Sequence, residues 1–136
     1  MRVTRRADAA LRAMQALAGA RLDARAVLPV RELARRSGVP APFLQQVLLG
    51  LRRGGVVASR GGRYGGYRLA RPAAAISVGE VLRTAQPDLG PMPCAARGAR
   101  GACADEAGCR ARPVWVRVRR ATERIVDGIT LAELAA

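Results

Sequence analysis

The sequence predicts a mainly α-helical protein with a small β-hairpin wing: a winged helix-turn-helix domain followed by a long C-terminal helix. Three observations predict this fold. Two short segments with helical patterning flank a tight turn at residues 38–40, a glycine-rich hairpin follows them, and residues 113–128 carry an apolar stripe at helical spacing. We expect a winged helix-turn-helix domain at residues 1–86, a cysteine-containing loop at 87–112, and a dimerisation helix with a final turn at 113–136.

Capping residues set the expected limits of the first three helices. Thr4 is suited to cap a helix that runs to about Leu22. A second helix is expected over residues 30–37, because Gly38 can adopt the left-handed conformation that ends a helix. The third helix begins near Pro42, since a proline in the first turn loses no hydrogen bond, and a pair of glycines ends it. Helix, short turn and helix together form the helix-turn-helix signature.

A β-hairpin is expected directly after this helix pair. Residues 56–59 and 67–70 are expected to form two short strands around a glycine-rich loop at residues 60–66. In this position the hairpin is a wing. The alternative is an ordinary solvated turn whose glycines permit positive φ. The loop also holds side chains suited to a phosphate backbone or a narrow minor groove, namely Arg60, Arg63 and Tyr64.

The C-terminal part is expected to contain two helices separated by an irregular loop. A capping box at Ser77–Glu80 opens a helix that ends before Pro87. From there to Arg112 no periodicity is visible, and a loop of that length is uncommon unless it is functional or disordered. The helix over residues 113–128 bears an apolar stripe and the chain's one Trp, so we expect it to pack on a second copy of itself. A second capping box at residues 130–133 opens a last short turn.

Charge is distributed unevenly along the chain. All 24 basic residues are arginine, and with 10 acidic residues they give a net charge of +14. Residues 1–71 carry a net +12 and residues 72–136 a net +2. This excess indicates that the first half faces a polyanion, and double-stranded DNA is favoured because contacts to phosphates release counterions. The alternatives are a basic helix on an anionic membrane, an RNA-associated protein, and a thiol-redox or metal-storage protein.

Composition also excludes several classes of protein. The chain contains no His, the commonest general base, and it shows no phosphate-binding loop and no evident pair of catalytic carboxylates. We therefore expect no enzyme. No stretch is long and apolar enough to span a bilayer, and no apolar leader follows the first arginines. We therefore expect a cytoplasmic protein with no membrane partner.

Three cysteines lie within sixteen residues of the irregular loop, at Cys94, Cys103 and Cys109. Thiolates from one loop suit a soft metal or an iron–sulfur cluster. Zinc needs a fourth ligand, and structural zinc sites usually bring two closely spaced cysteine pairs, which this chain lacks. A disulfide is the weakest interpretation, because the number of cysteines is odd and the expected compartment is reducing. Redox thiols, or incidental thiols in a mobile loop, are also compatible with this spacing.

The order and separation of several segments resemble one family, the Rrf-type bacterial winged-helix regulators, over nearly the whole chain. The matching segments are the opening Met1–Met14, Leu33–Leu48 with Ser37-Gly38-Val39-Pro40 and Phe43-Leu44-Gln45-Gln46, Leu51–Val57, the wing Arg60–Leu69, Ile76–Val81, the three-cysteine loop, and Trp115 with the ending Thr130–Leu134. The resemblance implies a homodimer that binds operator DNA, with the long helix after the cysteine loop forming the dimer seam. It also implies an iron–sulfur cluster, 2Fe-2S or 4Fe-4S, held by the three cysteines.

The chain departs from the family pattern in the cysteine loop. Cys94 and Cys103 are further apart than in the best-known sensors. IscR-like members carry a His three residues after the last cysteine, where this chain has Arg112, and arginine cannot ligate iron at neutral pH. NsrR-like members, which sense nitric oxide, complete the cluster with an Asp near the N-terminus of the partner subunit, and Asp8 matches that position. The local alternatives to Asp8 are Asp105 and Glu106, and a first-turn Asp is also explained by the helix dipole alone.

The sequence thus predicts a DNA-binding transcriptional regulator, a repressor, whose operator affinity is controlled by an iron–sulfur cluster that senses nitric oxide, redox state or iron. The alternative is a thiol- or zinc-based redox regulator without such a cluster. Base reading is assigned to the exposed start of the third helix, because glutamine can bond adenine. The candidate DNA contacts are Pro42, Gln45 and Gln46 on that helix, and Arg5, Arg6, Arg60, Arg63 and Tyr64 at phosphates or the minor groove. Four further arginines stay ambiguous, namely Arg35, Arg36, Arg52 and Arg53.

Overall fold

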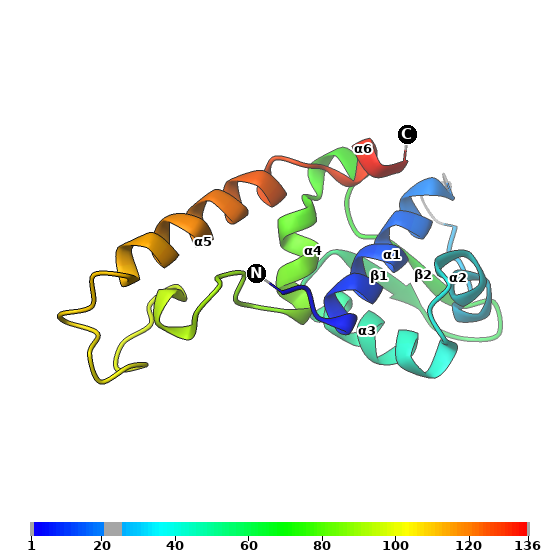
Figure 1. Ribbon diagram of the computed structural model, residues 1–136. Helices are drawn as coiled ribbons and strands as arrows, with labels where there is room; N and C mark the ends of the chain where they lie inside the picture. Colours follow the sequence, from blue (N-terminus) through cyan, green and yellow to red (C-terminus); the bar gives the residue numbers. More distant parts are fainter. Residues whose placement is uncertain (1, 21–25, 136) are drawn as a thin grey trace.

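The structure is a computed structural model that describes residues 2–20 and 26–135 (Figure 1). Helices form most of it, and one two-stranded antiparallel hairpin lies among them, which confirms the predicted fold class. The predicted end of the first helix at Leu22 lies outside the described residues. The elements are α1 Arg5–Gly19, α2 Val30–Ser37, α3 Ala41–Arg53, β1 Val57–Arg60, β2 Gly66–Leu69, η1 Ala73–Ala75, α4 Val78–Ala85, η2 Pro93–Ala95, α5 Arg112–Asp127 and α6 Leu131–Ala135.

Local capping explains where these helices begin and end. Thr4 caps α1, because its side chain accepts a hydrogen bond from the Ala7 N–H. Gly38 ends α2 with a φ of 70°, the left-handed conformation that favours glycine. At α4 both halves of the predicted capping box are present between Ser77 and Glu80. The sequence therefore predicted these three boundaries correctly.

The main core lies between α1 and the helix-turn-helix of α2 and α3. Met14 of α1 is fully buried, as are Leu33 of α2 and Leu44 and Leu48 of α3. Small alanines on the buried side of α1 let the neighbouring helices approach closely. This packing fixes the orientation of α3 and leaves its opposite face, including Gln45, exposed.

The wing is a hairpin in which Val57 pairs with Leu69 and Arg60 with Gly66. Leu28 adds a bridge on the other side of β2, because its backbone exchanges two hydrogen bonds of 2.8 Å with Tyr67. A side chain at Gly66 would collide with the Leu28 carbonyl, so glycine is required where this segment passes. The hairpin is therefore anchored through β2 and projects its loop into solvent.

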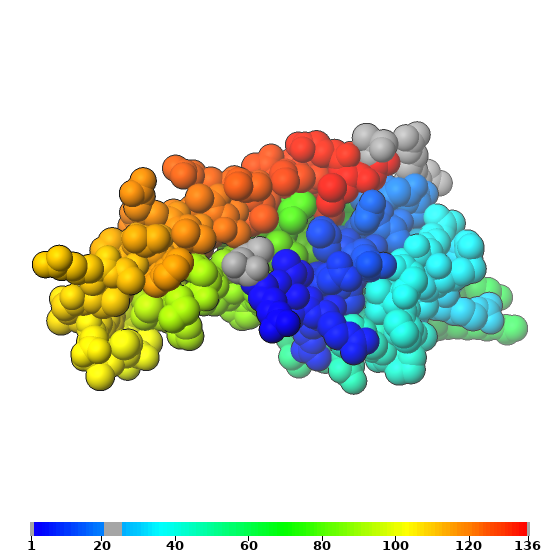
Figure 2. All heavy atoms as spheres, viewed as in Figure 1, coloured from blue at the N-terminus to red at the C-terminus, as the bar shows by residue number. Residues whose placement is uncertain are grey.

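The C-terminal elements leave the compact unit and return to it. Helix α5 extends away from the rest of the chain, with the cysteine loop at its far end (Figures 1 and 2). The sequence predicted an irregular loop. The structure differs from this prediction, because the loop contains the short turn η2. After α5 the chain returns, and Leu131 is fully buried in the core, where its N–H donates to the Ile76 carbonyl.

The last capping box forms only in part. The Glu133 N–H donates to the Thr130 hydroxyl at 3.4 Å. The Glu133 carboxylate accepts from that same hydroxyl, also at 3.4 Å, and not from the Thr130 backbone as a full capping box requires. In the parts of the chain that the structure describes, no helix combines the length and the apolar character needed to cross a membrane.

Candidate DNA-binding surface and cysteine loop

The N-terminus of α1 and the exposed face of α3 lie side by side. A guanidinium nitrogen of Arg6 donates to the Gln46 side-chain oxygen at 3.4 Å, across 40 residues of sequence. Arg5 and Arg6 line a small hollow together with Phe43. All of the candidate DNA contacts on these two helices are exposed, namely Arg5, Arg6, Pro42, Gln45 and Gln46. The fold thus brings Arg6 beside Gln46 and leaves all five of these candidate residues exposed.

A groove beside this surface contains Arg53, an arginine whose role was ambiguous in the sequence. Arg53 lines it together with Arg6, Gln46 and the small residues Gly50 and Gly54. Its volume is about 600 Å³. Arg53 lies seven residues after Gln46, which is two helical turns, so the helical period of α3 could have placed it on the same face.

The tip of the wing presents three polar side chains to solvent. The Arg60 guanidinium donates to the Tyr64 carbonyl at 3.1 Å and so braces the loop. The Arg63 guanidinium lies 5.8 Å from the centre of the Tyr64 ring, within the range of a cation–π contact. The Tyr64 side chain is 78% exposed. An exposed aromatic ring beside two arginines is suited to contact a nucleic-acid backbone.

Two of the ambiguous arginines are paired within α2. Arg35 and Arg36 both donate to the Glu32 carboxylate, and their hydrogen bonds lower the pKa of Glu32 to about 2. Glu32 therefore stays ionised and offsets part of the positive charge of its two neighbours. These contacts indicate a local role for Arg35 and Arg36 in α2.

The cysteine loop is organised by Arg112 at the start of α5. All three thiols are free, with Cys103 exposed and the other two half-buried. Arg112 Nε donates to the Cys94 carbonyl at 3.1 Å, and its guanidinium lies 3.6 Å from the Glu106 carboxylate. Glu106 in turn accepts from the Gly101 N–H. Arg112 therefore holds the first cysteine and the middle of the loop at the base of α5.

The three thiols fit an iron–sulfur cluster by their chemistry, since they are free and lie on one loop. They are not gathered into a site. Within residues 2–20 and 26–135, no group of three Cys, Asp or Glu side chains is arranged to hold a metal ion. Asp8 lies on α1, where its carboxylate accepts from Arg12 Nε at 2.9 Å and is 56% exposed. The candidate ligands therefore have the right donor atoms, and the loop would have to rearrange to bring them together.

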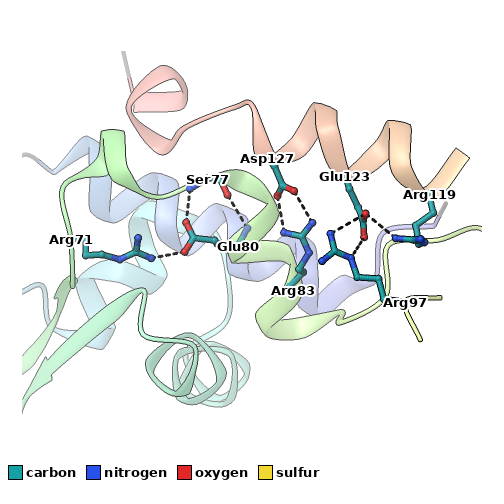
Figure 3. A network of polar contacts seen from close by, with 8 residues as sticks. All are labelled: Arg71, Ser77, Glu80, Arg83, Arg97, Arg119, Glu123 and Asp127. Carbon is teal, nitrogen blue, oxygen red and sulfur yellow. Dashed lines mark hydrogen bonds and ion pairs between the residues drawn. The ribbon is translucent and has the colours of Figure 1, made fainter. Parts of the chain in front are cut away.

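A buried carboxylate holds the beginning of the loop against α5 (Figure 3). Glu123 is only 8% exposed. It accepts two hydrogen bonds from Arg97, of 2.9 and 3.1 Å, and one of 2.9 Å from Arg119. Arg119 also donates to the Ala95 carbonyl at 2.6 Å. The hydrogen bonds from Arg97 and Arg119 lower the pKa of Glu123, so the group is ionised near neutral pH.

A second ion pair fixes the other end of α5 to α4. Arg83 of α4 makes a two-pronged contact with Asp127, with distances of 2.7 and 3.0 Å (Figure 3). This contact lowers the pKa of Asp127. Along the same face of α5, Val126 packs against a small apolar cluster that contains Leu82 of α4. One face of α5 is thus occupied from the cysteine loop to α4.

The opposite face of α5 is apolar and exposed. Val114, Val118 and Ile125 lie on it at helical spacing and are 51%, 37% and 63% exposed. Arginines 117, 120 and 124 flank this stripe. An exposed apolar stripe with a charged border is typical of a surface that packs against another protein.

The sequence profile of one family matches nearly the whole chain. It is the profile of the Rrf2 family, described as an iron-dependent transcriptional regulator, and it matches residues 3–136. The chain belongs to the Rrf2 family. An rrf2-like HTH-type transcriptional regulator of Rhodobacter capsulatus is 39% identical over 138 residues, which cover 98% of this chain and 92% of the relative. The IscR regulator of Yersinia enterocolitica is 32% identical over 107 residues, covering 79% of this chain and 63% of the relative.

Solved structures of Rrf2-type regulators have the same fold. IscR of T. potens superposes with a TM-score of 0.74 at 28% identity, covering 98% of this chain and 85% of that one. CymR, the global cysteine regulator of B. subtilis, gives a TM-score of 0.76 over 99% of this chain and 96% of that one. Its identity is 24%, so this likeness concerns the fold alone. Family membership makes this chain a DNA-binding transcriptional regulator, and the names of its relatives support the expectation that it is not an enzyme.

The Glu123 contacts predict a pH-dependent contribution to stability. Because the folded-state pKa of Glu123 lies below its ordinary value of 4.5, this contribution is fully present above pH 4.5 and is lost as the pH falls through the lower folded value. We expect Glu123→Gln to reduce the free energy of unfolding by about 1–3 kcal/mol at neutral pH. The difference from the wild type should shrink below pH 4.5. Urea unfolding at fixed protein concentration and a series of pH values measures both effects.

Glu133→Gln is the control for this experiment, because it removes one carboxylate from the exposed side of α6. It should change the free energy of unfolding by less than about 0.5 kcal/mol. A Glu123→Gln deficit that stays constant down to pH 3 would contradict the proposed contribution of the ionised carboxylate.

Proposed function

We propose that this Rrf2 regulator binds operator DNA as a homodimer and that the state of its cysteine loop sets its affinity. The DNA surface consists of the exposed start of α3, the N-terminus of α1 and the wing. The Arg6–Gln46 hydrogen bond is the observation that carries this assignment, because it joins a phosphate-binding side chain to a base-reading one on adjacent helices. In a dimer, two such surfaces would face successive major grooves about one helical turn apart.

The residues of this surface have different tasks. Arg5 and Arg6 sit where α1 begins and would contact phosphates, which fixes the protein on the duplex without reading sequence. Gln45 and Gln46 would read base edges, and Pro42 lies at the exposed start of the same helix. The wing would place Arg60, Arg63 and Tyr64 at the backbone or the minor groove.

Single substitutions separate these tasks. Arg6→Ala should weaken binding to all duplexes and reduce the slope of log K against log salt by about 0.9, because one phosphate contact is lost. Gln45→Ala should keep the slope and lose about 1–3 kcal/mol of discrimination between bases. Fluorescence anisotropy measures both on a duplex selected by the wild-type chain from a random-sequence pool. Each variant is the control for the other, and a changed slope for Gln45→Ala would contradict its role as a base reader.

The apolar face of α5 is proposed as the dimer seam. Its inner face is occupied by the Glu123 and Asp127 contacts, so the stripe that contains Val118 is the one left to meet another chain. A twofold interface uses the same patch on both subunits, and each change in it acts twice.

A charge in this seam should separate the subunits. Val118→Glu should raise the dimer dissociation constant at least about 100-fold, since it places two like charges in an apolar interface. Sedimentation equilibrium measures the change. Val3→Glu is the matched control, because Val3 is also an exposed valine, at 50% against 37% for Val118, and lies outside α5. A Val118→Glu variant that dimerises like the wild type would rule out this face.

We further propose that Cys94, Cys103 and Cys109 hold an iron–sulfur cluster, with Asp8 of the partner subunit as the fourth ligand. Three free thiols on one loop and the likeness to IscR support this assignment. Arg112 occupies the position where IscR-like members carry a histidine, and it is bound to the Cys94 carbonyl. We therefore assign the fourth position to a carboxylate. Glu106, which Arg112 and Gly101 hold within the loop, is a local alternative, and Asp8 is preferred because it matches the position of the aspartate ligand in NsrR-like members.

When bound, a cluster with one carboxylate ligand supplies an iron site open to small molecules such as nitric oxide. The chain's own residues would transmit the state of the loop. Asp8 would leave Arg12 and connect the N-terminal helix of one subunit to the loop of the other. Release of Asp8 would then free α1 beside the DNA-reading helix, and the spacing of the two reading helices would change.

Anaerobic reconstitution with iron and sulfide tests this assignment. The wild-type protein should become coloured, with iron and sulfide in equal amounts, and should lose operator affinity at least about tenfold when nitric oxide is added, an effect of about 1.4 kcal/mol. Asp8→Ala should bind DNA with little response to nitric oxide. Asp105→Ala is the matched control, because it removes a carboxylate from the loop itself.

Arg12→Ala distinguishes cluster ligation by Asp8 from the Arg12–Asp8 ion pair. Like Asp8→Ala it breaks this ion pair, but it keeps the Asp8 carboxylate. It should respond to nitric oxide like the wild type. Colourless protein, or an Asp8→Ala variant with normal cluster content and response, would contradict the assignment.

A thiol sensor without a cluster is the second candidate function. The exposed Cys103 favours it, because an accessible thiol is open to oxidation. In that case the colourless protein would lose DNA affinity on mild oxidation and regain it with a thiol reductant. A zinc-bound protein would instead be colourless and lose its response when the metal is chelated.

A further inference from the structure

The side chain of Gln86 bridges two segments that are far apart in the sequence. Gln86 follows the last residue of α4 and precedes the cysteine loop. Its Nε2 donates to the Arg2 carbonyl at 2.9 Å, and its Oε1 accepts from the Thr4 N–H at 3.0 Å. The amide thus pairs with the backbone on both sides of Val3, as a neighbouring β-strand would do.

These two bonds fix the start of α1. Thr4 is extended, with φ −73° and ψ 157°, and its hydroxyl caps the helix through the Ala7 N–H at 3.1 Å. Arg5 and Arg6 follow immediately and point to the hollow beside α3 that they line with Phe43. A helix end held only by its own turn would fray, whereas this one is held to α4 through Gln86.

We propose that Gln86 is a positioning residue for DNA binding: it holds residues 2–4 against the end of α4 and so orders Arg5 and Arg6 for contact with phosphates. This inference rests on the proposed role of those two arginines. Gln86 itself does not need to touch DNA. Its effect comes from reducing the conformational freedom that the two arginine side chains would lose on binding.

Gln86→Met tests the proposal, because methionine has nearly the same length and makes neither hydrogen bond. On the selected duplex, we expect a five- to tenfold loss of affinity. The decisive measurement is a double-mutant cycle with the Arg5→Ala/Arg6→Ala variant. In that background Gln86→Met should change affinity by less than about twofold, because there are no arginines left to order.

Gln15→Met is the matched control. Gln15 also joins α1 to another element, since its Nε2 donates to the Leu134 carbonyl at 3.4 Å. It lies further along α1, away from Arg5 and Arg6, and its substitution should leave DNA affinity unchanged. Gln86→Asn, which is too short to make both bonds, provides a second variant, and thermal unfolding of each variant shows whether it is folded.

Three outcomes are distinguishable. A loss of affinity for Gln86→Met that disappears in the Arg5→Ala/Arg6→Ala background supports the proposal. An unchanged affinity for Gln86→Met, or an equal loss in both backgrounds, overturns it and leaves the proposed DNA surface intact. If Arg5→Ala/Arg6→Ala binds as tightly as the wild type, the assigned DNA surface and the role of Gln86 both fail.

Discussion

Burial of the Glu123 carboxylate is the interaction on which the arrangement of the C-terminal half depends. A carboxylate that is nearly inaccessible to water is costly unless charged donors surround it, and Arg97 and Arg119 supply three hydrogen bonds. This requirement locks the loop before Cys103 onto one face of α5. Together with the Arg83–Asp127 pair it leaves only the opposite face of α5 open. The helix therefore has one face that is occupied by its own chain and another that is exposed.

The positions of the acidic residues determine which arginine charges are offset by ion pairs. Glu32, Glu80, Glu123 and Asp127 are each engaged by arginine within the described chain. These pairs offset charge on α2, α4 and α5. Arg5 and Arg6 at the start of α1 form no ion pair with an acidic residue of the described chain, so their positive charge is available to a polyanion.

Local signals predicted the elements better than they predicted the site. Thr4, Gly38 and the Ser77–Glu80 box act within one helical turn, so the sequence alone located those boundaries. The contact of Arg97 with Glu123 spans 26 residues and that of Gln86 with Arg2 spans 84, and no periodicity or motif marks either pair. Sequence patterns identify Arg112 only as a residue that cannot bind iron. Its hydrogen bond to the Cys94 carbonyl could not be predicted, because it depends on how the loop folds back onto α5.

The contacts that hold the cysteine loop on α5 and the contacts that hold the N-terminus on α4 differ in strength. Glu123 is nearly inaccessible to water, and breaking its contacts with Arg97 and Arg119 would leave a buried charge without partners. The amide of Gln86 is partly exposed, and a solvent-accessible hydrogen bond contributes only about 0.5–1.5 kcal/mol. The Gln86 contacts are therefore the weaker of the two connections and cost less free energy to break than the contacts of Glu123. Since about 1.4 kcal/mol corresponds to a tenfold change in an equilibrium constant, the loss of these contacts is of the size that the proposed role of Gln86 in DNA binding requires.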